Sequence, residues 1–215
     1  GATFEQTDFA NPTDSLYIRR GNATDTIAMT SLPNLTSNIF IGDTDPFASF
    51  TFSGTTTLAV DKNIETYTSG PTSSSGVANI TTSGLGNIRF DSQSSIFIGV
   101  NTTLTTENGL IEMKANQQAV PTSGSFTGVS VGGLVRSTGA GQIALYGRGG
   151  DTGNNQIVVS VAGDIEAGPG GLAYLEGTGG ASSGNNNYGI FCAVSGSPSI
   201  TSGGGITLIG TGGGT

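Results

Sequence analysis

The stretch Gly141-Gln142-Ile143-Ala144-Leu145-Tyr146-Gly147 decides the fold, because the chain repeats its pattern. The pattern is Gly-x-apolar-x-apolar-x-small, and it returns at residues 171–177 and 204–210. Alternation of apolar and other residues is typical of a β-strand with one buried face. Recurrence of one strand pattern at a period of a few tens of residues indicates a solenoid.

The repeat extends upstream in a weaker form. Its leading apolar residues are expected at positions 27, 58, 88, 111, 143, 173 and 206, with steps of 23 to 33 residues. Each period offers three short strand-like pieces between turns rich in Gly, Ser, Asn and Thr, and no helical periodicity. We therefore predict an all-β, parallel β-helix (β-solenoid) with three short strands per coil and about seven coils. Their apolar residues should form a continuous core column.

This alignment divides the chain into two segments. Residues 1–26 do not fit the repeat, although residues 16–18 alternate like a strand, and we expect either a cap or the end of a preceding coil. Residues 27–215 carry the repeats and stop within a fresh one, which suggests a longer parent chain. Of the 37 glycines, 28 lie in residues 108–215, so we expect the C-terminal half to be the more regular.

The alignment also predicts a register of charges. If Ile88 and Ile111 start neighbouring inward-facing rows, Arg89 lies beside Glu112 on the outer surface. Asp91 then lies beside Lys114, so two complementary pairs face each other across the strands. Such pairs contribute only about 0.2–1 kcal/mol each, and their main value is to test the register.

Composition excludes several classes of function. The net charge is −8 with only seven Lys and Arg, which offers no basic face to nucleic acid. No apolar run approaches the roughly 20 residues of a membrane-spanning helix, so we expect no membrane insertion. The chain has no histidine to activate Cys192 as a nucleophile. Alternation places this single cysteine on the side of Ile190 and Val194, and we expect it to be buried.

Residues 141–147, 163–171 and 205–214 resemble repeats of large exported bacterial β-solenoid proteins, the filamentous-haemagglutinin-like and autotransporter-passenger-like adhesins. The resemblance covers residues 86–215 well and 27–85 loosely, and it is one of composition and period without an invariant motif. It implies a right-handed helix at the cell surface or in secreted fibres, with a role in adhesion or scaffolding. No counterpart of the secretion domain or membrane barrel of that group occurs in the sequence.

An enzyme acting on polysaccharides is the alternative. A glycoside hydrolase needs two carboxylates, and Asp61 and Asp91 are expected in one outward column on adjacent coils. Lys62 and Arg89 could serve a lyase as base and clamp. Solvated surface acids are the simpler interpretation of Asp61 and Asp91, and nothing beyond proximity marks Lys62 and Arg89.

Other motifs are weaker. Asp43 and Asp45 flank a turn and supply two of the six or more oxygens that calcium requires. The glycines of residues 177–180 lack the lysine and following helix of a phosphate-binding loop, and we interpret them as turns. Tyr146 and Tyr174 are expected on one outer face, and Tyr188 on a loop, where aromatic rings could stack on sugars or anchor a protein.

These observations predict a non-enzymatic structural or adhesive segment of a secreted or cell-surface protein. We assign no catalytic, cofactor-binding or metal-binding residue. The expected partners are neighbouring repeats or copies of the chain end to end, and a host, neighbouring-cell or polysaccharide surface. Contacts are expected at the corner loops.

Overall fold

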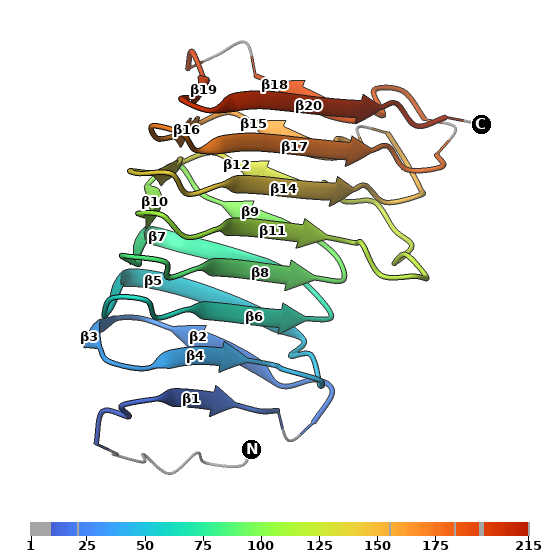
Figure 1. The fold of residues 1–215 in the computed structure, drawn as a ribbon. Helices are drawn as coiled ribbons and strands as arrows, with labels where there is room; N and C mark the ends of the chain where they lie inside the picture. The colour runs from blue at the N-terminus through green and yellow to red at the C-terminus, as the bar shows by residue number, and fades with distance from the viewer. Residues whose placement is uncertain (1–9, 21, 155, 183, 194–195, 215) are drawn as a thin grey trace.

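A computed structural model describes residues 10–20, 22–154, 156–182, 184–193 and 196–214 of the chain. Within these ranges the secondary structure is entirely β, with no helix. The strands stack from the N-terminal to the C-terminal end of the molecule in chain order (Figure 1). All of their pairings are parallel, as a β-helix requires.

Eight strands form one sheet. Each of them pairs with the next member of this sheet in chain order. They are β1 (Ser15–Ile18), β4 (Asn38–Ile41), β6 (Ile64–Thr68), β8 (Ile88–Ser92), β11 (Ile111–Ala115), β14 (Ile143–Arg148), β17 (Leu172–Thr178) and β20 (Gly205–Thr211). The chain leaves this sheet after every strand and returns one position further along the stack.

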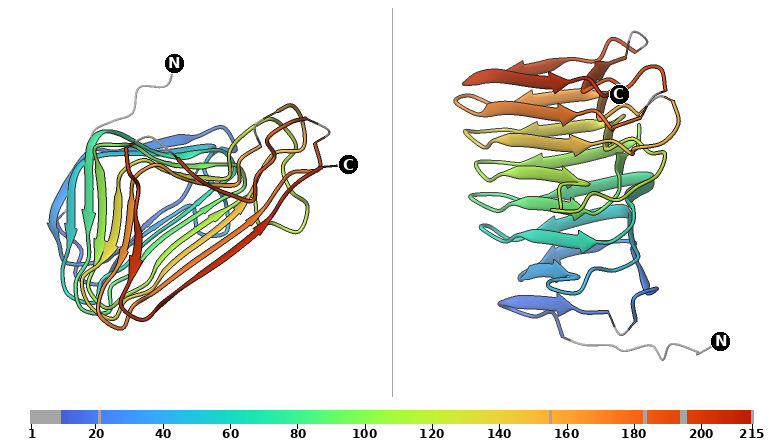
Figure 2. Two further views of the ribbon diagram at one scale, coloured as in Figure 1. Left: turned by 90° about the horizontal axis from the view of Figure 1, so that it is seen from above. Right: turned by 90° about the vertical axis from the view of Figure 1, so that its right-hand side faces the viewer.

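The excursions build a second, twelve-stranded sheet. Its strands are β2 (Thr26–Met29), β3 (Leu32–Leu35), β5 (Ser49–Leu58), β7 (Thr72–Thr81), β9 (Ile96–Ile98), β10 (Thr102–Thr106), β12 (Val129–Val131), β13 (Leu134–Ser137), β15 (Val159–Val161), β16 (Asp164–Ala167), β18 (Ile190–Cys192) and β19 (Ile200–Ser202). The view from above shows both sheets wrapping around one interior (Figure 2, left). The architecture is consistent with a parallel β-helix.

The long strands β5 and β7 bend within the second sheet. Between β5 and β7 the register shifts after Phe52, next to Gly54. Gly54 has φ of 66°, a left-handed conformation that glycine adopts without a steric penalty. A Cβ atom at Gly54 would also clash with the backbone carbonyl of Thr30. Gly54 therefore permits one strand to serve two faces.

The core consists of columns of apolar side chains. Each strand of a sheet contributes one residue to each column. In the eight-stranded sheet the first buried column runs through Ile39, Ile64, Ile88, Ile111, Ile143 and Ala173, all at most 1% exposed. Phe50, Phe52 and Phe90 fill the wider interior near the N-terminal end, with ring centroids 5.4 to 6.3 Å apart. Complete burial of one such side chain stabilises the fold by roughly 1.5–3 kcal/mol.

Asparagines form a ladder where the chain enters the eight-stranded sheet. The Oδ1 atom of Asn38 accepts a hydrogen bond from the backbone N–H of Asn63 at 2.9 Å. Asn63 accepts one from the N–H of Asn87 at 2.8 Å, and Asn87 accepts one from the N–H of Leu110 at 2.7 Å. Each amide thereby satisfies a backbone donor that the turn would otherwise leave without a partner.

The predicted repeat is confirmed in part. Ile88, Ile111, Ile143, Ala173 and Ile206 are Cα partners in successive strands, as expected. The assignment of Ile27 and Leu58 to the same column is wrong, because both belong to the twelve-stranded sheet. All inward faces of the stack carry the same alternation, so hydrophobicity alone does not tell which face a strand occupies.

The expected regularity of the C-terminal half is also wrong. The column in the eight-stranded sheet contains Leu16, Ile39, Ile64, Ile88 and Ile111, which are 23, 25, 24 and 23 residues apart. From Ile111 onward the steps are 32, 30 and 33 residues, to positions 143, 173 and 206. The longer connections of this half project from one corner (Figure 2, left).

The two ends of the chain need separate comment. Part of the atypical segment 1–26 forms β1, which is the end strand of its sheet, and the segment ends at the first residue of β2; residues 1–9 lie outside the described residues. Cys192 pairs in register with the buried Val161, so it occupies the predicted face. Its expected burial is nevertheless wrong: Cys192 is exposed, because β18 is the last strand of its sheet in the described chain.

We predict that Asn87→Ala lowers the free energy of unfolding by about 1–3 kcal/mol, because it leaves the N–H of Leu110 without its acceptor. Equilibrium unfolding in urea measures the loss. Asn101→Ala, at an exposed turn residue, is the control and should change stability by less than about 0.5 kcal/mol. Equal losses in the two variants would refute a stabilising role for the ladder.

Candidate binding groove

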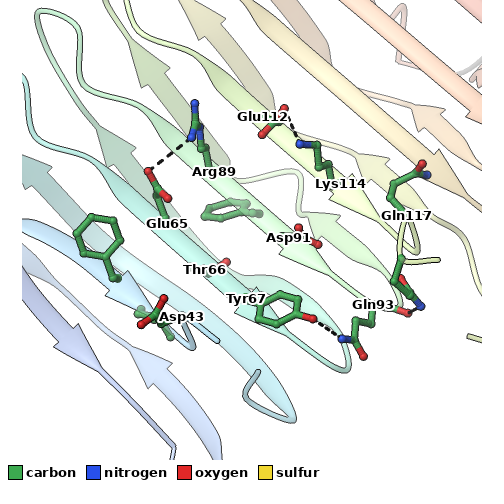
Figure 3. Close-up of a pocket in the computed structure, with 14 residues that line it drawn as sticks. Asp43, Glu65, Thr66, Tyr67, Arg89, Asp91, Gln93, Glu112, Lys114 and Gln117 are labelled. Carbon is green, nitrogen blue, oxygen red and sulfur yellow. Dashed lines mark hydrogen bonds and ion pairs between the residues drawn. The ribbon is translucent and has the colours of Figure 1, made fainter. Parts of the chain in front are cut away.

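A groove of about 700 Å³ lies on the outer face of the eight-stranded sheet (Figure 3). It crosses four successive strands, β4, β6, β8 and β11, and it therefore runs along the stack. Aromatic, amide and charged side chains dominate its surface. The lining residues are Phe40, Ile41, Asp43, Glu65, Thr66, Tyr67, Arg89, Phe90, Asp91, Gln93, Glu112, Lys114, Gln117 and Gln118.

The floor of the groove consists of two columns of outward side chains. They alternate along each strand with the buried residues, so the core pattern fixes their direction. The first column contains Glu65, Arg89 and Glu112, which are Cα partners. The second contains Tyr67, Asp91 and Lys114, which are partners in the same way.

A chain of hydrogen bonds forms one wall. Gln93 donates from Nε2 to the hydroxyl of Tyr67 at 2.5 Å, and Gln118 donates from Nε2 to the backbone carbonyl of Gln93 at 3.1 Å. Gln118 also donates to Oδ1 of Asn116 at 2.9 Å. The wall therefore holds the Tyr67 ring in one orientation before any ligand arrives.

The loop that completes this wall follows β11, where the spacing between equivalent residues of successive strands rises from 23 to 32 residues. Asn116, at its base, is fully buried with φ of 58°. Its Oδ1 accepts from the N–H of Thr122 at 2.6 Å, and its Nδ2 donates to the carbonyl of Gly149 at 3.3 Å. These bonds tie the loop to the body of the sheet, so Gln117 and Gln118 stand at a defined edge of the groove.

Ion pairs engage three of the four carboxylates that line the groove. Arg89 lies 3.8 Å from Glu65, and Lys114 lies 3.0 Å from Glu112 on its own strand (Figure 3). Asp43 pairs with Arg19 at 3.2 Å. Among the described residues, the carboxylate of Asp91 makes neither an ion pair nor a hydrogen bond. One carboxylate acceptor in the groove is thus free.

The predicted register of charges is confirmed, although the ion pairs differ from it. Arg89 is the Cα partner of Glu112, and Asp91 is that of Lys114, as expected. Arg89 instead contacts Glu65 on the preceding strand, which is also its Cα partner. Arg89 thus pairs across strands, whereas Lys114 pairs with Glu112 on its own strand.

The groove perturbs the ionisation of Asp91. The side chain reaches solvent, yet the surrounding walls displace enough water to raise the pKa of its carboxyl group. Lys114 opposes this effect, and Glu112 adds to it by repulsion. A carboxylate with a raised pKa and no partner is unfavourable for folding at neutral pH, a pattern common at functional sites.

Aromatic side chains continue along the same outer face beyond the groove. Tyr146 and Tyr174 lie together as predicted, with ring centroids 5.5 Å apart, and the Lys114 ammonium group lies 5.8 Å from the Tyr146 ring centroid. On the other side, Tyr17 stacks on Phe40 at 4.8 Å. Tyr188 lies elsewhere and stacks on Phe191 at 5.7 Å.

The expected pairing of Asp61 with Asp91 is wrong. Asp61 lies in the turn after β5, with φ of 62°, and its carboxylate accepts a hydrogen bond from the N–H of Leu85 at 2.7 Å. The Asp61 carboxylate therefore holds the corresponding turn of the next coil in place. Lys62, in the same turn, does not line the groove that contains Arg89. The error has one cause, the assignment of Leu58 to the wrong face.

The remaining candidates carry no site. Asp43 and Asp45 each face an arginine, at 3.2 Å from Arg19 and 3.6 Å from Arg20. In the described part of the chain no three His, Cys, Asp or Glu side chains gather as a metal site would require. The glycines of residues 177–180 lie at the end of β17 and in the following turn. None of the described residues forms a helix that could reach across a bilayer.

Sequence reasoning missed Glu65, Tyr67, Gln93 and Gln118 as groove residues. The nearly constant step from Ile39 to Ile64 to Ile88 was the available signal, because it places Glu65 beside Arg89 and Tyr67 beside Asp91. Comparison with protein-family models, curated proteins and solved structures finds no match. The geometry of the groove and of the stack is therefore the basis for a function.

We predict that Asp91→Asn stabilises the fold at neutral pH. The raised pKa means that the native state loses stability as pH rises through it, and the amide removes this loss. The gain should stay below about 1 kcal/mol, because solvent screens the accessible carboxylate. Below the ordinary aspartate pKa of 3.8 it should vanish.

Urea unfolding of the wild type and Asp91→Asn at neutral and acidic pH measures this difference. Asp14→Asn, at an exposed position outside the groove, is the control for the change in net charge. A loss of stability in Asp91→Asn at neutral pH would contradict the expected cost of the partly desolvated charge.

Proposed function

We propose that this chain is a right-handed parallel β-helix with three short strands per coil and about seven coils. We further propose that it serves as a structural and adhesive rod in a secreted or cell-surface repeat protein. The observation that carries the proposal is the unbroken parallel register of eight strands over one core column. Stacked equivalent units of this kind give a stiff, elongated body whose length grows with the number of repeats.

The pairing of the long strands supports three strands per coil. Between consecutive strands of the eight-stranded sheet the chain forms either two short strands or one ten-residue strand. The first part of β7 pairs with β9 and its second part with β10, so the long strand fills both positions. Connections between parallel strands of one sheet are right-handed in about 98% of cases, which favours that hand.

The C-terminal face of the stack suits end-to-end association. Ile206 and Leu208 of β20 are 47% and 50% exposed, although they continue the columns of the buried Ala173 and Leu175. On its outer side β20 has no strand partner among the described residues. Apolar side chains beside unpaired strand edges favour association with a further coil or a second copy of the chain.

The state of the groove acids supports binding over catalysis. A glycoside hydrolase uses one protonated and one ionised carboxyl group. Glu65 and Glu112 are instead each held in an ion pair, with Arg89 and Lys114 respectively. The raised pKa of Asp91 is the observation that favours the alternative, a carbohydrate-active β-helix enzyme.

End-to-end association provides the test of the rod. Sedimentation velocity and electron microscopy of the purified chain, under reducing conditions because Cys192 is exposed, should show linear assemblies that grow with concentration. The double variant Ile206→Lys, Leu208→Lys should remain largely monomeric, since it places two charges on the apolar face. Val77→Lys, at an exposed position in β7, should assemble like the wild type. A wild-type chain that stays monomeric at all concentrations would refute the association.

A further inference from the structure

The groove over β4, β6, β8 and β11 combines three kinds of side chain that recognise sugars. Tyr67 supplies an aromatic ring, on which the C–H face of a pyranose can stack. Gln93, Gln117 and Gln118 supply planar amides, and Asp91 supplies a free carboxylate. Amides and carboxylates form paired hydrogen bonds with neighbouring hydroxyl groups.

Two polar groups of the floor have unused hydrogen-bonding capacity. The Arg89 side chain is 43% exposed, and its guanidinium group keeps terminal N–H donors besides the one that faces Glu65. Asp91, its neighbour two residues along β8, retains its acceptors. A polar ligand with donors and acceptors side by side would satisfy both groups, and a hydroxylated ring has this property.

The direction of the groove selects an extended ligand. It crosses the strands, and parallel neighbours are about 4.8 Å apart, a distance close to the length of one sugar ring. Tyr67, Asp91 and Lys114 mark three positions in one column, separated by two such steps. A sugar chain laid along the stack would present one ring to each strand.

The charge of the groove excludes acidic ligands. Four carboxylates and two cationic side chains line it, which leaves an excess of two negative charges in a chain of net charge −8. Uronic-acid and sulfated polymers would be repelled. An extended peptide would require a free strand edge or apolar side-chain pockets, whereas this face presents planar polar groups in the middle of a sheet.

We propose that the groove binds a strand of uncharged polysaccharide across β6, β8 and β11, with one sugar ring against Tyr67 and its hydroxyl groups bonded to Asp91, Arg89 and Gln93. This inference deepens the proposed adhesive function and rests on it. The hydrogen bond from Gln93 to the Tyr67 hydroxyl holds the ring in place, which lowers the entropic cost of binding.

Isothermal titration calorimetry of the full chain tests the proposal. The probes are neutral hexasaccharides of β-1,4-glucose, β-1,4-mannose and β-1,3-glucose, with hexagalacturonate as the acidic counterpart. At least one neutral probe should bind, and the acidic one should bind at least tenfold more weakly. No neutral binding, or a preference for hexagalacturonate, would overturn the inference.

Variants then locate the bound sugar. Tyr67→Ala and Asp91→Asn should each weaken binding at least tenfold, and Tyr67→Phe, which keeps the ring, should weaken it less than Tyr67→Ala. Tyr174→Ala is the matched control, because Tyr174 lies on the same sheet face outside the groove and should leave affinity within twofold. Circular dichroism of each variant verifies folding. Undiminished binding by a folded Tyr67→Ala would overturn the site.

The outcomes separate this inference from the proposed function. Linear assembly without sugar binding would support the proposed rod and refute sugar binding in the groove. Binding followed by cleavage of the hexasaccharide, detected by chromatography of the products, would support the groove and refute a purely non-enzymatic role.

Discussion

The parallel backbone hydrogen bonding between equivalent strands is the interaction on which the rest of the molecule depends. Because each strand of the eight-stranded sheet pairs in register with the next, residues at equivalent positions form columns. Inward columns become a continuous apolar core, and outward columns become ordered rows of functional groups. Side chains hold the turns of neighbouring coils together, as the hydrogen bond from the N–H of Leu110 to Oδ1 of Asn87 illustrates. A single constraint thus organises the core, corners and surface.

The groove shows how the strand register can bring functional side chains together on the outer face of a sheet. Its floor is a direct product of the register, with Glu65, Arg89 and Glu112 in one row and Tyr67, Asp91 and Lys114 in the other. Its edge arises from a departure from the register, the longer connection after β11 that brings Gln118 against Gln93. The regular part supplies charge and an aromatic ring, and the irregular part encloses them.

Sequence alone predicted the parallel β architecture, the column from Ile88 to Ile206 and the register of Arg89 and Asp91 with Glu112 and Lys114. It misplaced Ile27 and Leu58, since every face of the stack carries the same apolar alternation. That error separated Tyr67 from Asp91 and concealed the groove. The position of Gln118 depends on how residues 116–128 fold over the sheet through Asn116, which no local pattern specifies.

The number of residues per coil rises after β11. As a result, the floor and the wall of the groove differ in the sequence changes that they tolerate. A residue inserted within β8 would move every later side chain of that strand to the opposite face, exchanging Asp91 for a buried neighbour. Insertions in residues 117–128 would alter the wall at small entropic cost and leave the strand pairing intact. The floor is therefore confined to substitution, whereas the wall can also change in length. A change in this one loop would therefore reshape the groove while retaining the same scaffold.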